Sequence, residues 1–259
     1  MAKEKRYFFF DYDGTLTAGM EIGVPASAKK TLDRLRAEGH FVAIATGRLQ
    51  VNIAEIARGL GLCNYLSDGG NGITLGHRLV SLEPLPRDIC IELIDELEAL
   101  GIPWAVTIAN EKVRRTRDRR YLDAAKVTAS YMGNVIDPAL DPRVTPLFMK
   151  VFVACGRDRE REIAALEKLP RVRFNEDCLI IEPDEKGDGI RRTLAILGAD
   201  PADVVVFGDG TNDLKMFDPV WTSIAMGNGI AALKERADFV TKPAIEDGIE
   251  YACRHYGWI

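Results

Sequence analysis

The sequence has little that would support an extracellular, zinc-binding or membrane-spanning role. Its 259 residues include five cysteines. Their number is odd, they are widely scattered, and no two form a C-x-x-C pair, so neither a disulfide framework nor a zinc site is indicated. The N-terminal apolar run is too short for the core of a signal peptide or for a bilayer span. We therefore expect a soluble, cytoplasmic protein with reduced thiols and no membrane partner.

Other absences narrow the possible activities. No G-x-S-x-G is present, and neither G-x-G-x-x-G nor the Walker pattern follows a predicted strand. The absence of these motifs counts against a serine hydrolase, a dinucleotide-binding enzyme and a P-loop ATPase. Positive charge is not in excess either, because 34 Lys and Arg stand against 39 Asp and Glu, a formal net charge of −5. We expect no nucleic-acid partner, since such a chain has no general attraction for a phosphate backbone.

What is present is an ordinary globular composition, 47% hydrophobic, at a length that suits one large or two modest domains. Apolar runs at 7–10, 41–45 and 204–207 are typical of strands buried on both faces. A helical pattern at 26–38 separates the first two runs, and another at 187–197 precedes the third. Strands that alternate with helices predict an α/β fold with a parallel sheet.

The middle of the chain has a different pattern. After a predicted hairpin at 73–80, Pro84 and Pro86 mark an exit from the first half of the sheet. Helix-like and strand-like segments then alternate, at 89–100, 104–108, 148–154, 159–169 and 178–181. We predict an inserted α+β domain over 85–181, with 1–84 and 182–259 forming the core domain.

Four polar clusters follow a predicted strand or open a predicted helix: Asp11–Thr15, Thr46–Arg48, Lys186–Gly187 and Gly208–Asp213. Taken singly, each is ordinary turn or capping chemistry. In an open α/β sheet, however, all four would meet at the carboxyl ends of the strands. Their joint occurrence therefore predicts a functional site at that edge.

The charge of this predicted site limits its chemistry. Asp11, Asp13, Asp209 and Asp213 against Lys186 leave a net charge of about −3, and like charges about 4 Å apart repel by roughly 4 kcal/mol at an effective dielectric near 20. Either several carboxylates stay protonated or a divalent cation lies among them. Oxygen ligands favour Mg²⁺, and glycine-rich turns at helix N-termini suit phosphate. These parts together indicate phosphoryl transfer.

Asp11–Thr15 matches the pattern D-x-D-G-T, and Gly208–Asp213 matches G-D-x-x-N-D. Together with Thr46–Arg48 and Lys186–Gly187, which lie between them along the chain, these segments resemble the four motifs of the haloacid dehalogenase (HAD) superfamily. The insertion between the second and third motifs resembles a C2-type cap. Further segments resemble the Cof-type subfamily IIB, namely Ser67–Gly72, Ile224–Gly229 and Glu246–Ile249. The resemblance implies a HAD-like Rossmannoid parallel-sheet core with an inserted α+β cap of the C2B type. Two positions depart from the family pattern: Asp68, where many relatives carry Asn, and Asp184–Glu185, where a Ser commonly precedes the lysine.

The resemblance also implies roles for the site residues. Asp11 would attack phosphorus, Asp13 would act as general acid and then base, and Lys186 would offset the charge of the nucleophile. Mg²⁺ would be held by Asp11, the main-chain carbonyl of Asp13, and Asp209. Asp213 is expected to orient Lys186 or a metal-bound water. The remaining predicted phosphate- and substrate-binding residues are Thr46, Gly47, Arg48 and Asn212.

The function implied is a Mg²⁺-dependent phosphatase for small phosphorylated metabolites such as sugar phosphates, acting as a monomer or weak homo-oligomer. Three alternatives stay open: a phosphomutase or phosphotransferase of the same superfamily, a receiver domain, and a non-catalytic phosphate-binding regulator. The arginine-rich run at Arg114–Arg120 could attract an anionic substrate tail, but we favour a solvated face.

Overall fold

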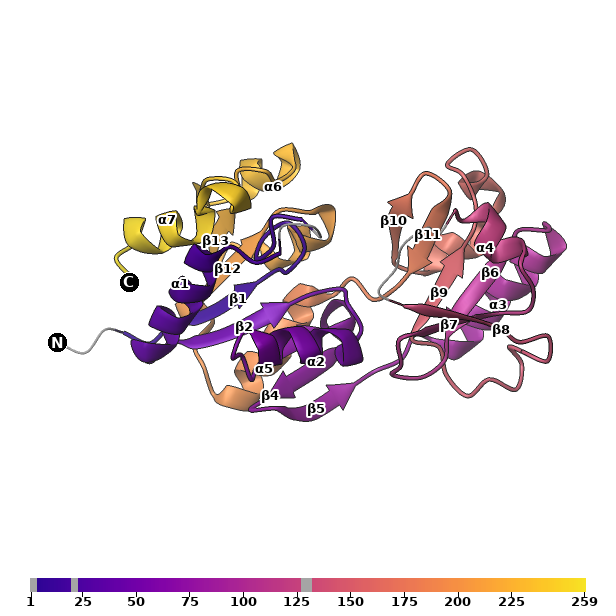
Figure 1. Ribbon diagram of the computed structural model, residues 1–259, viewed down its shortest axis with the longest axis horizontal. Helices are drawn as coiled ribbons and strands as arrows, with labels where there is room; N and C mark the ends of the chain where they lie inside the picture. The colour runs from indigo at the N-terminus through magenta and orange to yellow at the C-terminus, as the bar shows by residue number, and fades with distance from the viewer. Residues whose placement is uncertain (1–3, 20–22, 127–131) are drawn as a thin grey trace. The chain divides into compact units, whose positions relative to one another are not determined.

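The computed structural model describes residues 4–19, 23–126 and 132–259 (Figure 1). It contains two compact units. The first, here called the core unit, comprises Met1–Arg48, Ile53–Ser81 and Glu185–Ile259, and the second, the inserted unit, comprises Leu49–Asn52 and Leu82–Asp184. The assignment of 1–84 and 182–259 to catalysis and of 85–181 to substrate selection stays a prediction. No helix among the described residues is long and apolar enough to cross a bilayer.

The core unit is built on an eight-stranded sheet in the order β14-β13-β12-β1-β2-β3-β4-β5. Pairing is parallel from β14 to β3, and β4 joins antiparallel to β3. The strands are β1 (Tyr7–Phe10), β2 (Phe41–Ala45), β3 (Tyr65–Ser67), β4 (Gly72–Leu75), β5 (Arg78–Leu82), β12 (Val204–Gly208), β13 (Thr222–Ala225) and β14 (Phe239–Val240). The predicted parallel α/β core is therefore confirmed.

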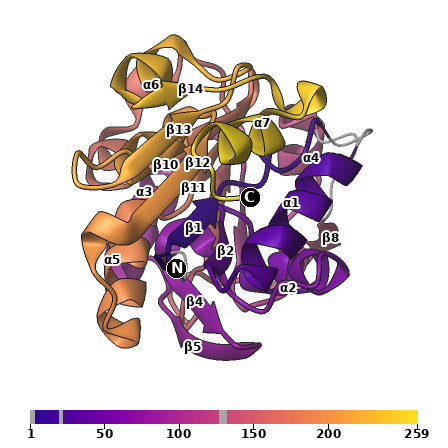
Figure 2. The same ribbon diagram turned by 90° about the vertical axis from the view of Figure 1, so that its left-hand side faces the viewer.

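Helices cover both faces of this sheet, which explains why β1 is apolar throughout. Phe8 and Phe10 belong to the cluster that packs under α1 (Ala26–Ala37), α2 (Gln50–Gly59) and α7 (Gly248–His255). Tyr7 and Phe9 belong to the opposite cluster, under α5 (Lys186–Leu197) and α6 (Ala231–Arg236). Figure 2 shows α1 and α7 on one side of the strands and α5 on the other.

Short turns and 3₁₀ helices complete the core unit. Gly76 and His77, between β4 and β5, both have positive φ, which suits a tight hairpin turn. The helix α5 ends at Gly198 in the left-handed conformation, as its sequence predicts. The 3₁₀ helices are η1 (Asp68–Gly70), η4 (Pro201–Asp203), η5 (Thr211–Met216) and η6 (Ala244–Glu246).

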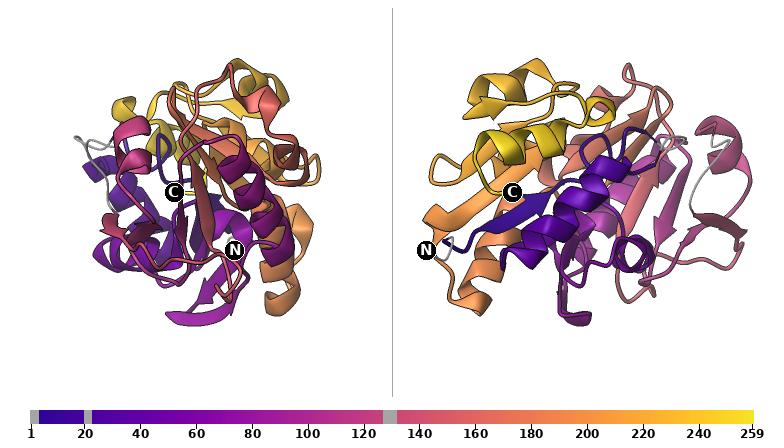
Figure 3. Two further views of the ribbon diagram at one scale, coloured as in Figure 1. Left: turned by 90° about the vertical axis from the view of Figure 1, so that its right-hand side faces the viewer. Right: turned by 60° about the vertical axis from the view of Figure 1, so that its left-hand side comes forward.

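The inserted unit is a six-stranded sheet in the order β10-β11-β9-β6-β7-β8. The long helix α3 (Arg87–Ala99) lies along one face of it (Figure 3). Leu93 and Leu97 of this helix share an apolar cluster with Val106 and Val151 of the sheet. The short helix α4 (Arg120–Ala124) contributes Tyr121 to the apolar cluster of the other face. The strands are β6 (Trp104–Thr107), β7 (Val113–Thr116), β8 (Gly133–Ile136), β9 (Lys150–Val153), β10 (Arg171–Asn175) and β11 (Cys178–Ile181).

The helix predicted over 159–169 is wrong. The segment forms two 3₁₀ helices instead, η2 (Glu160–Glu162) and η3 (Ala164–Lys168). Between them Ile163 leaves the helical region, at φ −107° and ψ 92°. The Glu96 carboxylate then accepts hydrogen bonds from the backbone N–H groups of Ala164 (2.7 Å) and Ala165 (2.8 Å). A side chain from α3 thus starts a new turn where the sequence pattern indicated a continuous helix.

The solvated face expected for Arg114–Arg120 is only partly right. Arg119 and Arg120 are exposed, but Arg114 in β7 is only 4% exposed. Because side chains alternate across a strand, Arg114 and Thr116 point inward while Arg115 pairs with Glu111 at 2.9 Å. Because almost every residue of the run is charged, the sequence does not show the alternation of inward and outward side chains that is typical of a strand.

Candidate active site

Three parallel strands place the predicted site residues at one edge of the core sheet. The strand β1 lies between β2 and β12, and all three run in the same direction. Asp11, Thr46 and Asp209 stand at the carboxyl ends of β1, β2 and β12 respectively. This is the edge at which open α/β sheets bind ligands.

Lys186, the first residue of α5, joins two of the carboxylates. Its Nζ atom lies 2.6 Å from Oδ1 of Asp11 and 2.7 Å from Oδ1 of Asp213. The lysine side chain is 1% exposed, and both aspartates are buried as well. A buried ammonium so placed offsets charge on Asp11 and fixes the orientation of its carboxylate.

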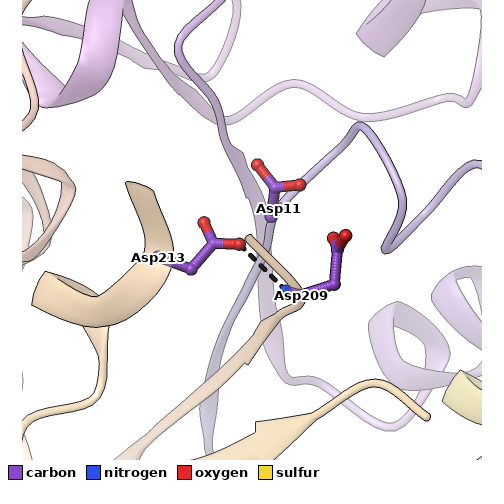
Figure 4. A group of neighbouring side chains, drawn as sticks. All are labelled: Asp11, Asp209 and Asp213. Atoms are coloured by element: carbon purple, nitrogen blue, oxygen red, sulfur yellow. Dashed lines mark hydrogen bonds between the residues drawn. The ribbon is translucent and has the colours of Figure 1, made fainter. Parts of the chain in front are cut away.

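Asp213 has both of its oxygens engaged within the protein. Oδ1 accepts from Lys186, and Oδ2 accepts from the backbone N–H groups of Asp209 and Gly210, each at 2.9 Å. Figure 4 shows the bond to Asp209 and the three carboxylates of Asp11, Asp209 and Asp213 around a common space. Asp213 therefore contacts both Lys186 and the turn after β12, and its predicted role in orienting Lys186 stays a prediction.

Asp209 is held by the loop that follows β1. The Thr15 hydroxyl donates a hydrogen bond of 2.7 Å to Oδ1 of Asp209. Gly14 packs so closely that a Cβ atom there would lie 2.3 Å from Oδ2 of Asp209, and its φ is +90°. Only glycine fits this close approach, which accounts for the Gly of the D-x-D-G-T motif.

These carboxylates suit a divalent cation. One oxygen from each of Asp11, Asp209 and Asp213 lies within 4.8 Å of the others. Burial, together with repulsion from Asp213, raises the pKa of Asp11 well above its ordinary value, and burial raises the pKa of Asp209 to about 6. Burial would lower the pKa of Lys186, but Asp11 and Asp213 raise it, so the lysine stays charged. Protons held by the aspartates are what a cation would replace.

The raised pKa of Asp209 predicts how stability depends on pH. A group whose pKa is higher in the folded than in the unfolded protein stabilises the fold at low pH, and this contribution is lost as pH rises through the folded value, here about 6. We expect the metal-free protein to lose on the order of 3 kcal/mol from this group between pH 4 and pH 7. Thermal unfolding in EDTA should show the loss, and Mg²⁺ should raise Tm more at pH 7.5 than at pH 5.

Asp209→Asn is the matched control for this experiment, because an amide does not titrate in that range. It should remove the share of Asp209 from the pH dependence of Tm in EDTA, leave the share of Asp11, and reduce the gain from Mg²⁺. A wild-type Mg²⁺ effect that is equal at both pH values would contradict the assignment of Asp209.

Asp13 lies apart from the buried cluster and is paired with Arg48. Nε and Nη2 of Arg48 donate to the two carboxylate oxygens of Asp13, at 2.8 and 2.6 Å. The guanidinium also lies over the Tyr12 ring, 4.8 Å from its centroid. The Asp13 side chain is 50% exposed. Arg48 thus compensates one of the four negative charges that the sequence placed against Lys186 alone.

The remaining predicted residues surround this edge without touching the acidic cluster. Thr46 is buried, and its Oγ1 accepts the backbone N–H of Arg48 at 3.1 Å, across Gly47. Asn212 is half-buried in η5. Among the residues that the structure describes, no hydrogen bond joins Thr46 or Asn212 to Asp11 or Asp209. Their predicted part in phosphate binding stays a prediction.

Sequence reasoning missed two residues that shape the site. Thr15 donates to Asp209, although within the D-x-D-G-T motif only Asp11 and Asp13 were given roles. Asn228 donates from Nδ2 to the carbonyl of Gly14 at 2.8 Å and accepts from the N–H of Ala244 at 2.9 Å. The Gly227–Asn228–Gly229 turn after β13 was the available signal for this support of the catalytic loop.

Comparison with known proteins agrees with this geometry. The model of the haloacid dehalogenase-like hydrolases matches residues 8–252. The chain belongs to this family. "Putative phosphatase YkrA" of Bacillus subtilis is 31% identical, over 98% of each chain. The 5-amino-6-(5-phospho-D-ribitylamino)uracil phosphatase YcsE of the same species is 25% identical, over 95% of this chain and 93% of its own.

A solved structure shows the same fold. The HAD subclass IIB sugar phosphatase BT4131 superimposes with a TM-score of 0.77 at 23% identity, over 98% of this chain and all of that one. The resemblance drawn from the four motifs is thus confirmed, and the protein is a phosphatase that acts on phosphorylated substrates. Membership of this family counts against the receiver-domain alternative, since the match covers nearly the whole chain.

Proposed function

We propose that this protein is a Mg²⁺-dependent phosphatase of small phosphorylated metabolites, sugar phosphates above all, and that it works through a phosphoryl group carried on Asp11. The observation that carries the proposal is the buried contact of Asp11 with Lys186, itself held by Asp213, beside the carboxylate of Asp209. A carboxylate oriented and partly neutralised in this way can approach an anionic phosphate ester.

The reaction divides into two steps. An oxygen of Asp11 forms a bond to phosphorus as the bond to the leaving oxygen breaks. For this step Asp13 has to be protonated and its ion pair with Arg48 opened, and it then gives that proton to the leaving oxygen. A water molecule then attacks the same phosphorus, Asp13 takes a proton from it, and the bond to Asp11 breaks to release inorganic phosphate. Lys186 keeps Asp11 in place throughout, because its ion pair with Asp213 does not depend on the substrate.

The fit of the acidic cluster to a cation completes the proposed site. Asp11, Asp209 and the main-chain carbonyl of Asp13 would hold Mg²⁺, which supplies positive charge against the phosphate in the transition state. Thr46, Gly47 and Asn212 would donate hydrogen bonds to the phosphate oxygens.

A panel of phosphate esters tests the substrate class. We expect kcat/KM with Mg²⁺ to be highest for a pentose, hexose or sugar-alcohol phosphate, and lower for nucleotides and for p-nitrophenyl phosphate. The phosphorylated ribitylaminouracil named for YcsE belongs in the panel. A nucleotide as best substrate would contradict the sugar-phosphate proposal while leaving the phosphatase assignment intact. An absolute need for a sugar bisphosphate activator, with transfer to sugar, would favour the phosphomutase alternative.

Asp13→Asn tests the general acid. We expect a large loss of kcat with an alkyl phosphate, whose leaving alkoxide needs a proton, and a smaller loss with p-nitrophenyl phosphate, whose leaving group does not. The ratio of the two losses is the measurement, taken from kcat at saturating Mg²⁺. Equal losses with both esters would remove Asp13 from this role.

Arg48 is expected to act through Asp13, since its guanidinium binds both oxygens of that carboxylate. Arg48→Ala should lower kcat/KM for an alkyl phosphate by about tenfold, and Arg48→Lys should lose less. The double variant with Asp13→Asn should be no slower than Asp13→Asn alone, because one interaction cannot be lost twice. Fully additive losses would show that Arg48 has a separate role, such as direct substrate binding.

A further inference from the structure

The peptide group between Asp13 and Gly14 has a defined orientation in the core unit. Its N–H, which belongs to Gly14, donates a hydrogen bond of 3.3 Å to the hydroxyl oxygen of Thr17. Its carbonyl, which belongs to Asp13, is the main-chain group proposed above as a ligand of Mg²⁺. The described residues contain no cis peptide bond. Since C=O and N–H point in opposite directions in a trans peptide group, the Asp13 carbonyl points away from Thr17.

Thr17 is itself held in place by the loop that follows β1. It is 5% exposed. Its hydroxyl donates to the Tyr12 carbonyl at 3.2 Å, and its backbone N–H donates to the same oxygen at 2.9 Å. The hydroxyl proton is thus directed at Tyr12, which leaves the lone pairs of the oxygen to accept from Gly14. Thr17 therefore offers a fixed acceptor to this peptide group.

A second side chain holds the peptide group on the other side of Gly14. Nδ2 of Asn228 donates to the Gly14 carbonyl at 2.8 Å, and Oδ1 of Asn228 accepts from the N–H of Ala244 at 2.9 Å. The turn that contains Asn228 also contacts the loop after β12, because the N–H of Ile230 donates to the Asp209 carbonyl at 2.9 Å. Both peptide groups that flank Gly14 are thus hydrogen-bonded to side chains.

Gly14 gives these hydrogen bonds a purpose. A Cβ atom has no room at this position beside Asp209, so the residue has to be glycine. Glycine also lets the adjoining peptide groups rotate with little steric resistance. Half a turn of the Asp13–Gly14 peptide group would reverse the direction of its carbonyl without moving the chain on either side. The hydrogen bond to Thr17 forms in only one of these two orientations.

The Asp13 carbonyl is available to a ligand in the observed orientation. Within 4–19, 23–126 and 132–259, no donor is hydrogen-bonded to it. The carbonyls of Asp11 and Tyr12, by contrast, accept from the backbone N–H groups of Leu16 and Thr17. A backbone carbonyl is a suitable oxygen ligand for a hard divalent cation. The carbonyl that the loop leaves open is therefore the one that the proposed cation site needs.

We propose that Thr17 is a positioning residue of the cation site and that Asn228 supports it. Thr17 holds the Asp13–Gly14 peptide group in the orientation in which the Asp13 carbonyl can bind Mg²⁺, and Asn228 restrains the next peptide group. The inference rests on the proposed function, which assigns that carbonyl to Mg²⁺. Neither side chain binds the cation itself, so replacing either should weaken the binding of Mg²⁺ and leave the carboxylates in place.

The first test measures the Kd for Mg²⁺ by isothermal titration calorimetry, with the full chain and without substrate. Thr17→Val keeps the shape of the side chain and removes the hydroxyl, so we expect the Kd to rise about tenfold or more. Thr17→Ser keeps the hydroxyl and should bind Mg²⁺ like the wild type. Asn228→Ala should raise the Kd by a smaller factor. Because Asn228 is exposed, this variant keeps the test decisive even if Thr17→Val does not fold.

The matched control is Thr193→Val in α5. Thr193 is 0% exposed, and its hydroxyl also donates to a backbone carbonyl, that of Gly189, at 2.9 Å. The variant should lose thermal stability, as Thr17→Val does, and keep the wild-type Kd for Mg²⁺. Equal Kd values in the two valine variants would overturn the proposal, because the effect of Thr17 would then be structural or absent. A wild-type Kd in Asn228→Ala would overturn the role of Asn228.

The second test observes the peptide group itself by nuclear magnetic resonance. Labelling with ¹³C-carbonyl aspartate and ¹⁵N-glycine selects Asp–Gly peptide groups, and the signal of Asp13–Gly14 is identified by its absence in Asp13→Asn. A cation polarises the carbonyl that it binds, so the Gly14 ¹⁵N resonance should shift saturably with Mg²⁺ in the wild type and in Thr17→Ser. Thr17→Val should need at least as much more Mg²⁺ for this shift as its Kd indicates.

The two measurements distinguish failure of this inference from failure of the proposed function. If the wild type binds Mg²⁺ in calorimetry and the Gly14 resonance does not shift, the inference is overturned and the phosphatase chemistry stands. If the wild type hydrolyses esters but binds no Mg²⁺, the metal dependence fails and the inference fails with it. If Mg²⁺ shifts Gly14 as expected while no sugar phosphate is hydrolysed, the proposed substrate class fails and the role of Thr17 stands.

Discussion

Asp11→Asn should fold like the wild type and lose turnover by roughly 10⁴-fold or more. An amide oxygen is a poor nucleophile toward an anionic phosphorus, and it is a weaker cation ligand than a carboxylate. The fold should survive, because Lys186 keeps its ion pair with Asp213 and β1 keeps its apolar contacts on both faces. The measurement is kcat with p-nitrophenyl phosphate and with the best sugar phosphate.

The matched control for this variant is Asp88→Asn, which makes the same chemical change at a side chain that is 97% exposed. It should retain full activity. Circular dichroism and thermal unfolding of both variants separate a lost nucleophile from a lost fold. Activity of a folded Asp11→Asn protein within tenfold of the wild type would remove Asp11 from the nucleophilic role.

Removal of divalent cations should abolish activity, and Mg²⁺ should restore it. Three buried or half-buried carboxylates against one ammonium leave excess negative charge where an anionic phosphate has to approach. Without a cation, attack should be prevented in either protonation state: ionised carboxylates repel the phosphate, and a proton held on Asp11 removes the nucleophile. The measurement is a Mg²⁺ titration after EDTA treatment, and Asp209→Asn should need a much higher Mg²⁺ concentration.

Ca²⁺ is the informative replacement. It accepts more ligands at longer distances than Mg²⁺ and would engage both oxygens of Asp11, which draws the attacking oxygen from the in-line path. We expect Ca²⁺ to compete with Mg²⁺ and to support no turnover. Full activity with Ca²⁺ alone would contradict the proposed geometry of the nucleophile.

The sequence was sufficient for those parts of the molecule that local patterns determine. Doubly buried strands such as β1 and β12 are continuous apolar runs, and the polar residues that follow them converge because parallel strands share their carboxyl edge. The contact of Lys186 with Asp11 and Asp213 follows from the same rule, since α5 opens at that edge. The motif spacing was enough to place these groups together.

The remaining features depend on contacts between residues distant in sequence. Nothing near Arg48 indicates that it binds Asp13 rather than a substrate, and nothing near Ile163 indicates that Glu96 accepts the next two backbone donors. The burial of Arg114 was hidden in a run of charges, because only the pairing of β7 with β6 shows which residues face inward. Such pairings are determined by tertiary structure, and local propensity does not predict them.

Chemical trapping of the phosphoryl-enzyme tests the central claim most directly. The wild type is mixed with its best substrate and Mg²⁺, quenched in acid within one turnover, digested and analysed by mass spectrometry. The account predicts a phosphoryl group on the peptide that contains Asp11, acid-stable and hydroxylamine-labile, formed at least as fast as kcat and absent from Asp11→Asn. Turnover with no phosphorylated peptide at any quench time, or with the group on another residue, would contradict it.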